Sequence, residues 1–162
     1  MLTVYYGCGL RRGEGVKLER DDIFFDRKLL HVRHGKGYRE RFVPISKTGI
    51  LHLQNYLYDA RPPLLRGTAG HERLFVGENG KPLTGSGMSM RLDLLVSRTE
   101  NPELIAKAPS LHKLRHSIAT HLLANGMSPE RIKDFLGHRS LESTQIYTHI
   151  LAECNGACSE TE

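Results

Sequence analysis

The sequence predicts an α+β fold: a mostly helical domain with a small antiparallel sheet near the N-terminus. The sheet is predicted by residues 21–45, where LLHVR alternates apolar and polar positions, HGKGY supplies a glycine-rich turn and RERFVPI returns. The helices are predicted by apolar residues that recur at helical spacing after residue 47, between capping residues and glycine stops. A chain of 162 residues is long enough for one domain with a sizeable core.

The first half of the chain is the less regular half. Residues 2–6 are apolar, and the glycines at positions 7, 9, 13 and 15 predict a weak helix at best. After the hairpin, we expect a helix from Lys47 to Arg61, with Pro62-Pro63 as its stop. Three segments are predicted before the next helix: a loop at 62–72, a short strand (RLFV) at 73–76 and a second loop at 77–87.

The second half is predicted to be helical, with clear start and stop signals. Ser110 is placed to cap a helix that ends at Asn125-Gly126. Ser128 is placed to cap a second helix, which begins with Pro129 and ends at Gly137. The two other expected helices span 88–97 and 140–151, and a polar tail follows at 152–162. We therefore expect the domain to occupy residues 1–151.

The net charge of +5 favours an anionic partner, and nucleic acid is the usual one for a basic protein. No apolar run approaches the roughly 20 residues that span a bilayer, and no export signal opens the chain. We therefore expect a cytoplasmic protein that does not act at a membrane. Three cysteines, an odd number, argue against a disulfide framework, and Cys154 and Cys158 lack the second Cys or His pair of a zinc site.

Six side chains that suit phosphate chemistry stand at distinctive places in this pattern. These places are a glycine-rich turn, a hairpin tip between two glycines, one helix face, the position after a helix stop and the last predicted helix. The residues are, in that order, Arg11, Lys36, His112 with Arg115, His138 and Tyr147.

Such a set suits the attack of an oxygen nucleophile on a phosphodiester. Negative charge builds on the non-bridging oxygens, and planar guanidinium groups bind those oxygens with paired hydrogen bonds. The leaving 5′ oxygen needs a proton, which a lysine or histidine supplies. A side-chain hydroxyl as nucleophile makes the intermediate covalent. No carboxylate cluster for two divalent metals is apparent in the sequence, so metal-free phosphoryl transfer is the better match.

Four segments of the chain closely resemble the motifs of the tyrosine recombinase (phage integrase) family. They are GCGLRRGE, HGKGYRERFVPI, LHKLRHSIATHLL and LGHRSLESTQIYTHI, and they lie in family order over residues 7–150. The resemblance is strongest to the Xer and transposon-integrase branch, which includes integrases of mobile elements. It implies DNA strand cleavage and rejoining through a 3′-phosphotyrosine, with no metal, ATP or other cofactor.

The resemblance also implies a role for each residue. Arg11 and Arg115 match the two catalytic arginines, and Lys36 matches the hairpin lysine that protonates the leaving oxygen. His112 matches the general acid/base, His138 a hydrogen-bond donor to the phosphate, and Tyr147 the nucleophile. A supporting position that orients the catalytic groups matches Glu14. The implied partners are double-stranded DNA and other recombinase subunits on it, a tetramer in the active synapse.

Several of these residues also have an ordinary structural explanation. An HxxR pair on a helix is usually surface charge, Lys36 at a turn is usually a solvated tip, and Tyr147 would serve as a core aromatic. His112 and His116 lie four residues apart and would suit a metal, but no carboxylate ligand is near in the sequence. Together, in family order and spacing, the residues favour the functional interpretation. A metal-dependent nuclease is not favoured, because the sequence lacks the carboxylate ligands that such an enzyme needs.

The chain departs from the family pattern at its start. Only ten residues precede Arg11, so we expect the N-terminal DNA-clamping domain of the family to be absent. Gly13 and Gly15 stand where the family usually has better helix formers. These departures leave a second hypothesis open: a catalytically idle DNA-binding fragment that interferes with intact recombinases.

Overall fold

The computed structural model describes residues 1–33, 40–65 and 71–138. Within these ranges it contains helices and one three-stranded antiparallel sheet, so the predicted α+β class is confirmed. Several predicted features lie outside the described residues: Lys36, Tyr147, the helix at 140–151, Cys154 with Cys158, and the tail at 152–162.

The N-terminal segment winds into a π-helical turn, η1 (Thr3–Gly7), followed by a short helix, α1 (Arg12–Lys17). The helix needs a glycine at position 15. A Cβ there would lie 2.5 Å from the ring of the buried Tyr5, so any larger residue would clash with it. The Glu14 side chain then accepts the backbone N–H of Arg11 at 2.8 Å, which caps the first turn.

The sheet has the order β1-β2-β3, with strands β1 (Ile23–Phe24), β2 (Leu29–Val32) and β3 (Arg41–Pro44). A 3-10 turn, η2 (Arg20–Asp22), leads into it. Leu30 pairs with Val43 and Val32 pairs with Arg41, and all four of these side chains are buried. The predicted hairpin is therefore confirmed, and its register sends Arg41 inward on the same face as the core residues.

The helix after the sheet differs from the prediction. It comprises α2 (Lys47–Asn55), a π-helical turn η3 (Tyr56–Ala60) and α3 (Arg61–Leu64). Pro62-Pro63 do not stop it: they lie in the first turn of α3, where a missing backbone N–H is tolerated.

The RLFV segment that follows is not a strand, although it was predicted as one. It forms only isolated bridges, Glu19 with Arg73 and Val76 with Pro82. The buried Arg61 holds this segment instead, because its guanidinium donates to the carbonyls of His71, Arg73 and Leu74.

The last described elements are α4 (Gly85–Ser97), α5 (Pro102–Lys107), α6 (Leu111–Ala124) and α7 (Pro129–Leu136). The predicted caps are confirmed, since Ser110 accepts from Lys113 N and Ser128 from Arg131 N. α4 begins three residues earlier than predicted because Thr84 accepts from the N–H of Gly87. α5 was not predicted, because six residues are too few to show a helical period.

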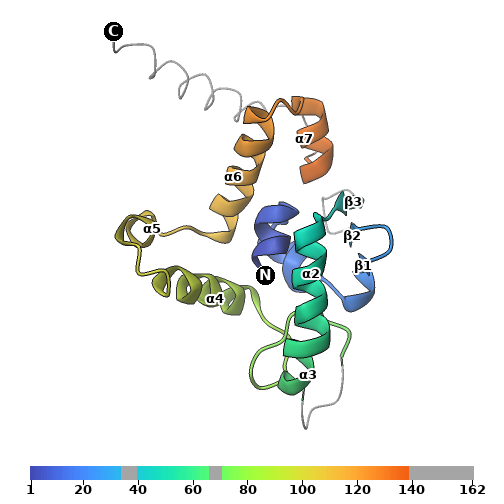
Figure 1. The fold of residues 1–162 in the computed structure, drawn as a ribbon, viewed down its shortest axis with the longest axis vertical. Coiled ribbons are helices and arrows are strands. Elements are labelled where there is room, and N and C mark those ends of the chain that lie inside the picture. Colours follow the sequence, from blue (N-terminus) through green and yellow to red (C-terminus); the bar gives the residue numbers. More distant parts are fainter. Residues whose placement is uncertain (34–39, 66–70, 139–162) are drawn as a thin grey trace.

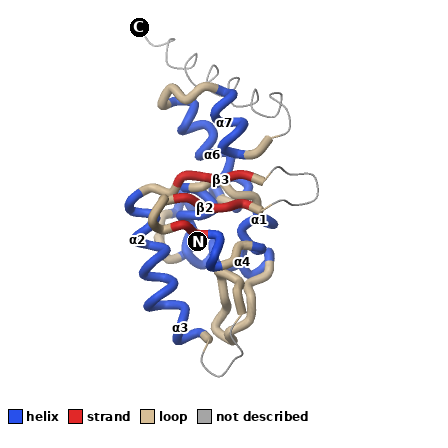
Figure 2. Tube along the Cα trace, turned by 90° about the vertical axis from the view of Figure 1, so that its right-hand side faces the viewer, coloured by secondary structure: helices blue, strands red, loops and turns tan. Residues whose placement is uncertain are grey.

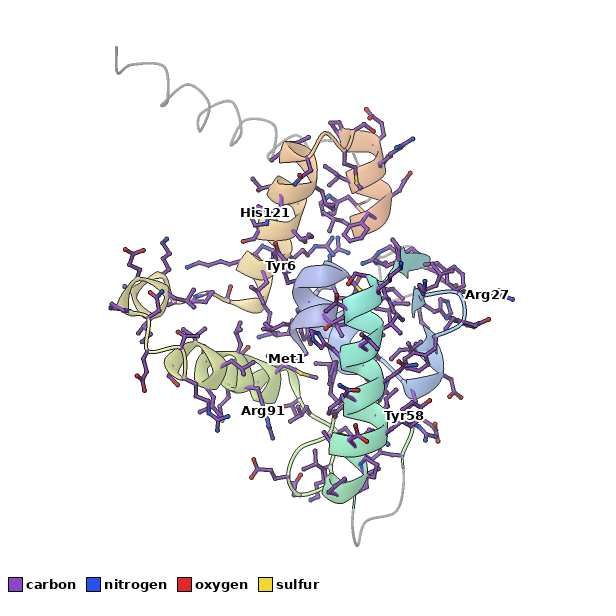
Figure 3. All side chains as sticks on the ribbon, in the orientation of Figure 1. Met1, Tyr6, Arg27, Tyr58, Arg91 and His121 are labelled. Carbon is purple, nitrogen blue, oxygen red and sulfur yellow. The ribbon has the colours of Figure 1, made fainter. Side chains whose placement is uncertain are left out.

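The helices lie on more than one side of the sheet. Figure 1 shows α6 and α7 together at one end of the molecule, and Figure 2 shows β2 and β3 between that pair and α2. The main core joins the sheet, η1, α2 and α4, whereas a smaller cluster of Ala119, Ile132 and Leu136 joins α6 to α7. Tyr6 and His121 meet where η1 packs on α6, with 2.6 Å between Tyr6 Oη and His121 Nδ1 (Figure 3).

Candidate active site

The site is built around the C-terminal end of α7. Gly137 takes a left-handed conformation with φ of 66°, its N–H donates to Asp134 O, and the N–H of His138 donates to Lys133 O. This is a Schellman motif, in which a glycine closes the helix and satisfies two of its last carbonyls. The carbonyls of Phe135 and Leu136 are left for other donors at the negative end of the helix dipole.

Three arginines from distant parts of the chain bind these two carbonyls. Arg41 Nε donates to Phe135 O at 2.9 Å. Arg115 Nη2 donates to Leu136 O at 2.7 Å, and Arg11 Nη1 approaches the same oxygen at 3.4 Å. The end of α7 therefore gathers guanidinium groups from the turn before α1, from β3 and from α6.

One carboxylate, that of Glu14, serves the same three guanidinium groups. Its oxygens accept from Arg41 at 3.0 and 3.1 Å and from Arg11 at 3.2 Å, and Arg115 Nη1 lies 3.8 Å away. Burial acts to raise the pKa of this carboxyl. Hydrogen bonds from Arg41 and the Arg11 backbone, with the charges of Arg41 and Arg115, outweigh burial and hold the pKa below its ordinary value.

The balance of charge in this cluster remains positive. Three guanidinium groups against one carboxylate leave a formal charge of +2, and the Arg11 side chain, at 23% exposed, is the most accessible of the four. Arg115 is buried and is further fixed by a hydrogen bond from Nη1 to Gly9 O at 2.5 Å. A positively charged, largely buried and rigidly held cluster is suited to a phosphate group.

His138 follows the α7 stop and lies against this cluster. It is 8% exposed. Burial lowers the pKa of its imidazole to about 4, with further lowering by the charges of Arg115, Arg11 and Arg41. The ring is therefore neutral at neutral pH in the free protein. A neutral imidazole carries one N–H, which suits it to donate a single hydrogen bond to an anion.

His112 lies one turn before Arg115 on α6, at the edge of a cleft of about 510 Å³. The residues that line this cleft come from α1, α4 and the start of α6: Arg11, Arg12, Ser89, Ser110, Leu111 and His112. Arg11 thus connects the arginine cluster to the cleft in which His112 stands. His116 Nε2 lies 2.6 Å from His112 Nε2, so one of the two rings donates to the other.

His116 is held in its neutral form. Burial lowers its pKa, and the charges of His112 and Arg115 lower it further. A neutral His116 orients the His112 ring by this hydrogen bond. No third ligand supports a metal site at His112 and His116. Over residues 1–33, 40–65 and 71–138, no three His, Cys, Asp or Glu side chains are placed to share an ion.

The structure thus brings together four of the predicted residues, Arg11, Glu14, Arg115 and His138, and sets His112 on the adjoining cleft. Lys36 and Tyr147 lie outside the described residues. Sequence reasoning missed Arg41, whose side chain is at the centre of the cluster and 7% exposed. The alternation of the strand could have predicted it, because Arg41 and Val43 are two residues apart and therefore share the inward face.

Comparison with known proteins identifies the family. The profile of the phage integrase family matches residues 1–153. The chain belongs to the phage integrase family.

Individual members of the phage integrase family resemble the chain at similar levels. It is 39% identical over 151 residues to "Tyrosine recombinase XerC" of Lacticaseibacillus casei and 38% identical over 150 residues to "Tyrosine recombinase XerD" of Listeria innocua. Each match covers 93% of this chain and 49% of the relative, so the chain spans about half the length of these curated relatives. The resemblance to the Xer branch is therefore confirmed.

Solved structures of the family share the fold. The XerA recombinase crystal structure superposes with a TM-score of 0.79 at 29% identity, over 99% of this chain and 57% of that one. XerH bound to its difH substrate superposes with a TM-score of 0.69 at 26% identity, over 98% and 44%. Among the helices of residues 1–138 that the structure describes, none has the length and apolar character to cross a membrane.

Proposed function

We propose that this chain is the catalytic domain of a site-specific DNA recombinase. It cleaves and rejoins DNA strands through a 3′-phosphotyrosine, with double-stranded DNA and further recombinase subunits as partners, in the cytoplasm. The observation that carries the proposal is the rigid +2 cluster of Arg11, Arg41, Arg115 and Glu14 beside the neutral His138. We assign residues 1–151 to the catalytic domain and 152–162 to a tail.

We assign phosphate binding to two of the arginines. Arg11 and Arg115 hold the non-bridging oxygens and stabilise the charge that grows on them in the transition state. His138 donates its one N–H to the same phosphate. The bound anion opposes the arginine charges that lower the His138 pKa, so DNA binding raises that pKa.

Bond making and breaking are assigned to three residues. The Tyr147 hydroxyl oxygen attacks phosphorus, and the hydroxyl proton passes to His112. The bond from phosphorus to the 5′ oxygen breaks, and Lys36 gives that oxygen its proton. Rejoining reverses these steps, because the 5′ hydroxyl attacks the phosphotyrosine and releases Tyr147. No metal ion or ATP takes part.

The test uses covalent trapping. The protein is incubated with a pool of nicked duplexes that carry a randomised 30-base-pair segment, and adducts that survive a denaturing gel are sequenced. We expect an adduct with wild-type protein that forms equally well with a metal chelator present. We expect none with Tyr147→Phe, which keeps the aromatic ring and removes the attacking oxygen.

Two results would count against the proposal. An adduct with Tyr147→Phe would show that another residue is the nucleophile. DNA binding without any adduct from the wild-type chain would favour the idle DNA-binding fragment instead.

A further inference from the structure

We propose that Arg41 is a positioning residue for the phosphate site: it neutralises Glu14 and locks β3 to the end of α7, so that Arg11 and Arg115 remain available to a phosphate. The identity of that phosphate as DNA rests on the proposed function. The positioning itself concerns any phosphate anion at the site.

The contacts of Arg41 use the whole guanidinium fork. Nη1 and Nη2 each donate to a different oxygen of Glu14, at 3.0 and 3.1 Å, while Nε donates to Phe135 O at 2.9 Å. The side chain is 7% exposed, so this arginine faces the protein interior and its partners. Its role is therefore to hold other groups, since its donors are directed at the carboxylate and the helix end.

The charge of Arg41 decides what Glu14 does to its neighbours. Glu14 is itself only 7% exposed, and a buried carboxylate needs a compensating partner. Without Arg41, that carboxylate is compensated by Arg11 and Arg115 alone. It would then draw to itself the two guanidinium groups that the phosphate needs.

The geometry of the helix end fits Arg41 closely. A Cβ at Gly137 would lie 2.8 Å from Arg41 Nη1 and 3.0 Å from Arg41 Cδ, so the absence of a side chain there makes room for the guanidinium. The residue after Gly137 is His138. Arg41 therefore packs against the very turn that delivers the imidazole to the phosphate site.

A lysine cannot replace these contacts. Its ammonium is a point charge on a flexible stem, whereas the planar fork of arginine reaches two carboxylate oxygens and a carbonyl at once. The charge effect of Arg41 and its positioning effect can therefore be separated by comparing Arg41→Gln with Arg41→Lys.

The experiment measures binding of inorganic phosphate by NMR titration of the arginine Nε resonances in the full chain. We expect Arg41→Gln to weaken phosphate binding by about tenfold or more, the scale of losing hydrogen bonds to a charged group. We expect Arg41→Lys to recover only a small part of that loss. Adding Glu14→Gln to Arg41→Gln removes the competing carboxylate, so the double variant should bind phosphate several-fold better than Arg41→Gln alone.

A matched control separates positioning from loss of stability. Arg61 is also buried and also ties segments together through three backbone carbonyls, but it holds the RLFV segment and not the arginine cluster. We expect Arg61→Gln to lower the unfolding temperature while phosphate binding stays within about twofold of wild type, since its lost hydrogen bonds are structural. Arg41→Lys, which keeps a positive charge beside Glu14, keeps the test usable if Arg41→Gln fails to fold.

The second readout is the single-turnover rate of adduct formation at saturating DNA. We expect Arg41→Gln to lower this rate at least tenfold while DNA affinity changes by less than about threefold, because other phosphate contacts dominate affinity. Phosphate binding by Arg41→Gln within twofold of wild type, or full recovery by Arg41→Lys, would overturn the positioning role. A wild-type chain that binds phosphate as expected but forms no adduct refutes the proposed function and leaves this inference standing.

Discussion

At the scale of residues, one carboxylate determines the arrangement and the net charge of the three arginines of this site. Glu14 accepts from two guanidinium groups, lies within 3.8 Å of a third and is itself 7% exposed. This arrangement holds the arginines in place and still leaves positive charge for a phosphate. A second carboxylate would have reduced the formal charge of the cluster to +1, and no carboxylate at all would have left three guanidinium groups to repel one another.

Replacing Arg115 by lysine tests the bidentate role. Arg115→Lys keeps the charge but loses the fork that binds Gly9 O and Leu136 O and that the proposed mechanism assigns to the phosphate. We expect adduct formation to fall on the order of a hundredfold or more, as for other lost transition-state donors. Overall DNA affinity should change little. A single-turnover cleavage assay checks this, and near-normal cleavage would exclude the bidentate role.

The low pKa of His138 makes stability depend on pH. The unfolded chain takes up a proton on this histidine as the pH falls through about 6.5, whereas the folded protein does so only near a pKa of about 4. Acid therefore favours the unfolded state across this window. The stability that the neutral His138 contributes is fully present above pH 6.5 and is lost as the pH falls toward 4, by on the order of 1–3 kcal/mol.

Urea unfolding between pH 4 and 7 measures this effect. We expect the free energy of unfolding to fall less steeply with acidification in His138→Gln than in wild type, because the variant lacks the proton uptake. The lowered pKa of His116 acts in both proteins and cancels. Parallel curves for the two proteins would contradict the low pKa of His138.

Residue types and spacing predicted most of the described cluster, but not all of it. Arg11, Glu14, Arg115 and His138 stand in recognisable motifs, and the structure brings them together. Arg41 escaped prediction because a charged residue in a strand usually faces solvent, although its alternation with Val43 and its register with Val32 both place it inward. Its partners, Glu14 and Phe135, lie 27 and 94 residues away in the sequence.

At the scale of elements, the helix ends were the most predictable feature. Ser110, Ser128 and Gly137 carry local signals that need no tertiary context, and all three act as predicted. The error at Pro62-Pro63 arose because a π-helical turn precedes the prolines and places them at a helix start. The error at RLFV arose because a buried arginine, rather than a neighbouring strand, satisfies its carbonyls.

Two helix-ending glycines allow a paired test. Gly126 and Gly137 both have positive φ, of 82° and 66°. A Cβ meets nothing within 4 Å at Gly126, whereas at Gly137 it lies 2.8 Å from Arg41 Nη1. Gly126→Ala should therefore cost only backbone strain, about 1 kcal/mol. Gly137→Ala should cost more, about 2–3 kcal/mol, because the Arg41 clamp must also shift.

Chemical denaturation of both variants gives the two costs directly. We also expect Gly137→Ala to weaken phosphate binding, because it displaces Arg41 and the turn before His138. Equal destabilisation by the two substitutions, with unchanged phosphate binding, would show that Arg41 adapts without consequence.

At the scale of the whole molecule, the site exists only in the folded chain. The turn before α1, strand β3, helix α6 and the end of α7 each give part of it, and Figure 2 shows β3 facing the α6–α7 pair with α1 beside the sheet. Sequence patterns predict each element separately. Their meeting depends on packing of η1 on α6 and of β3 on α7, which no local signal encodes.

The net charge of +5 predicts that DNA binding, under the proposed function, depends on salt. Each phosphate contact releases counterions from the DNA. The logarithm of the binding constant therefore falls linearly with the logarithm of the salt concentration, with a slope of about 0.9 per contact. With about four such contacts, the binding constant falls about a hundredfold between 50 and 200 mM salt. Fluorescence anisotropy of a labelled 30-base-pair duplex, titrated at several salt concentrations, measures the slope.

Arg115→Lys serves as the control in this titration. It keeps the charge of the chain and should give the wild-type slope, although we expect it to cleave poorly. Removing a charge at the accessible Arg11, by Arg11→Gln, should lower the slope by about one contact. Nanomolar binding that does not respond to salt would mean that contacts other than phosphate contacts dominate. The cluster at the end of α7 would then be a minor part of the DNA interface, contrary to the charge distribution described for it.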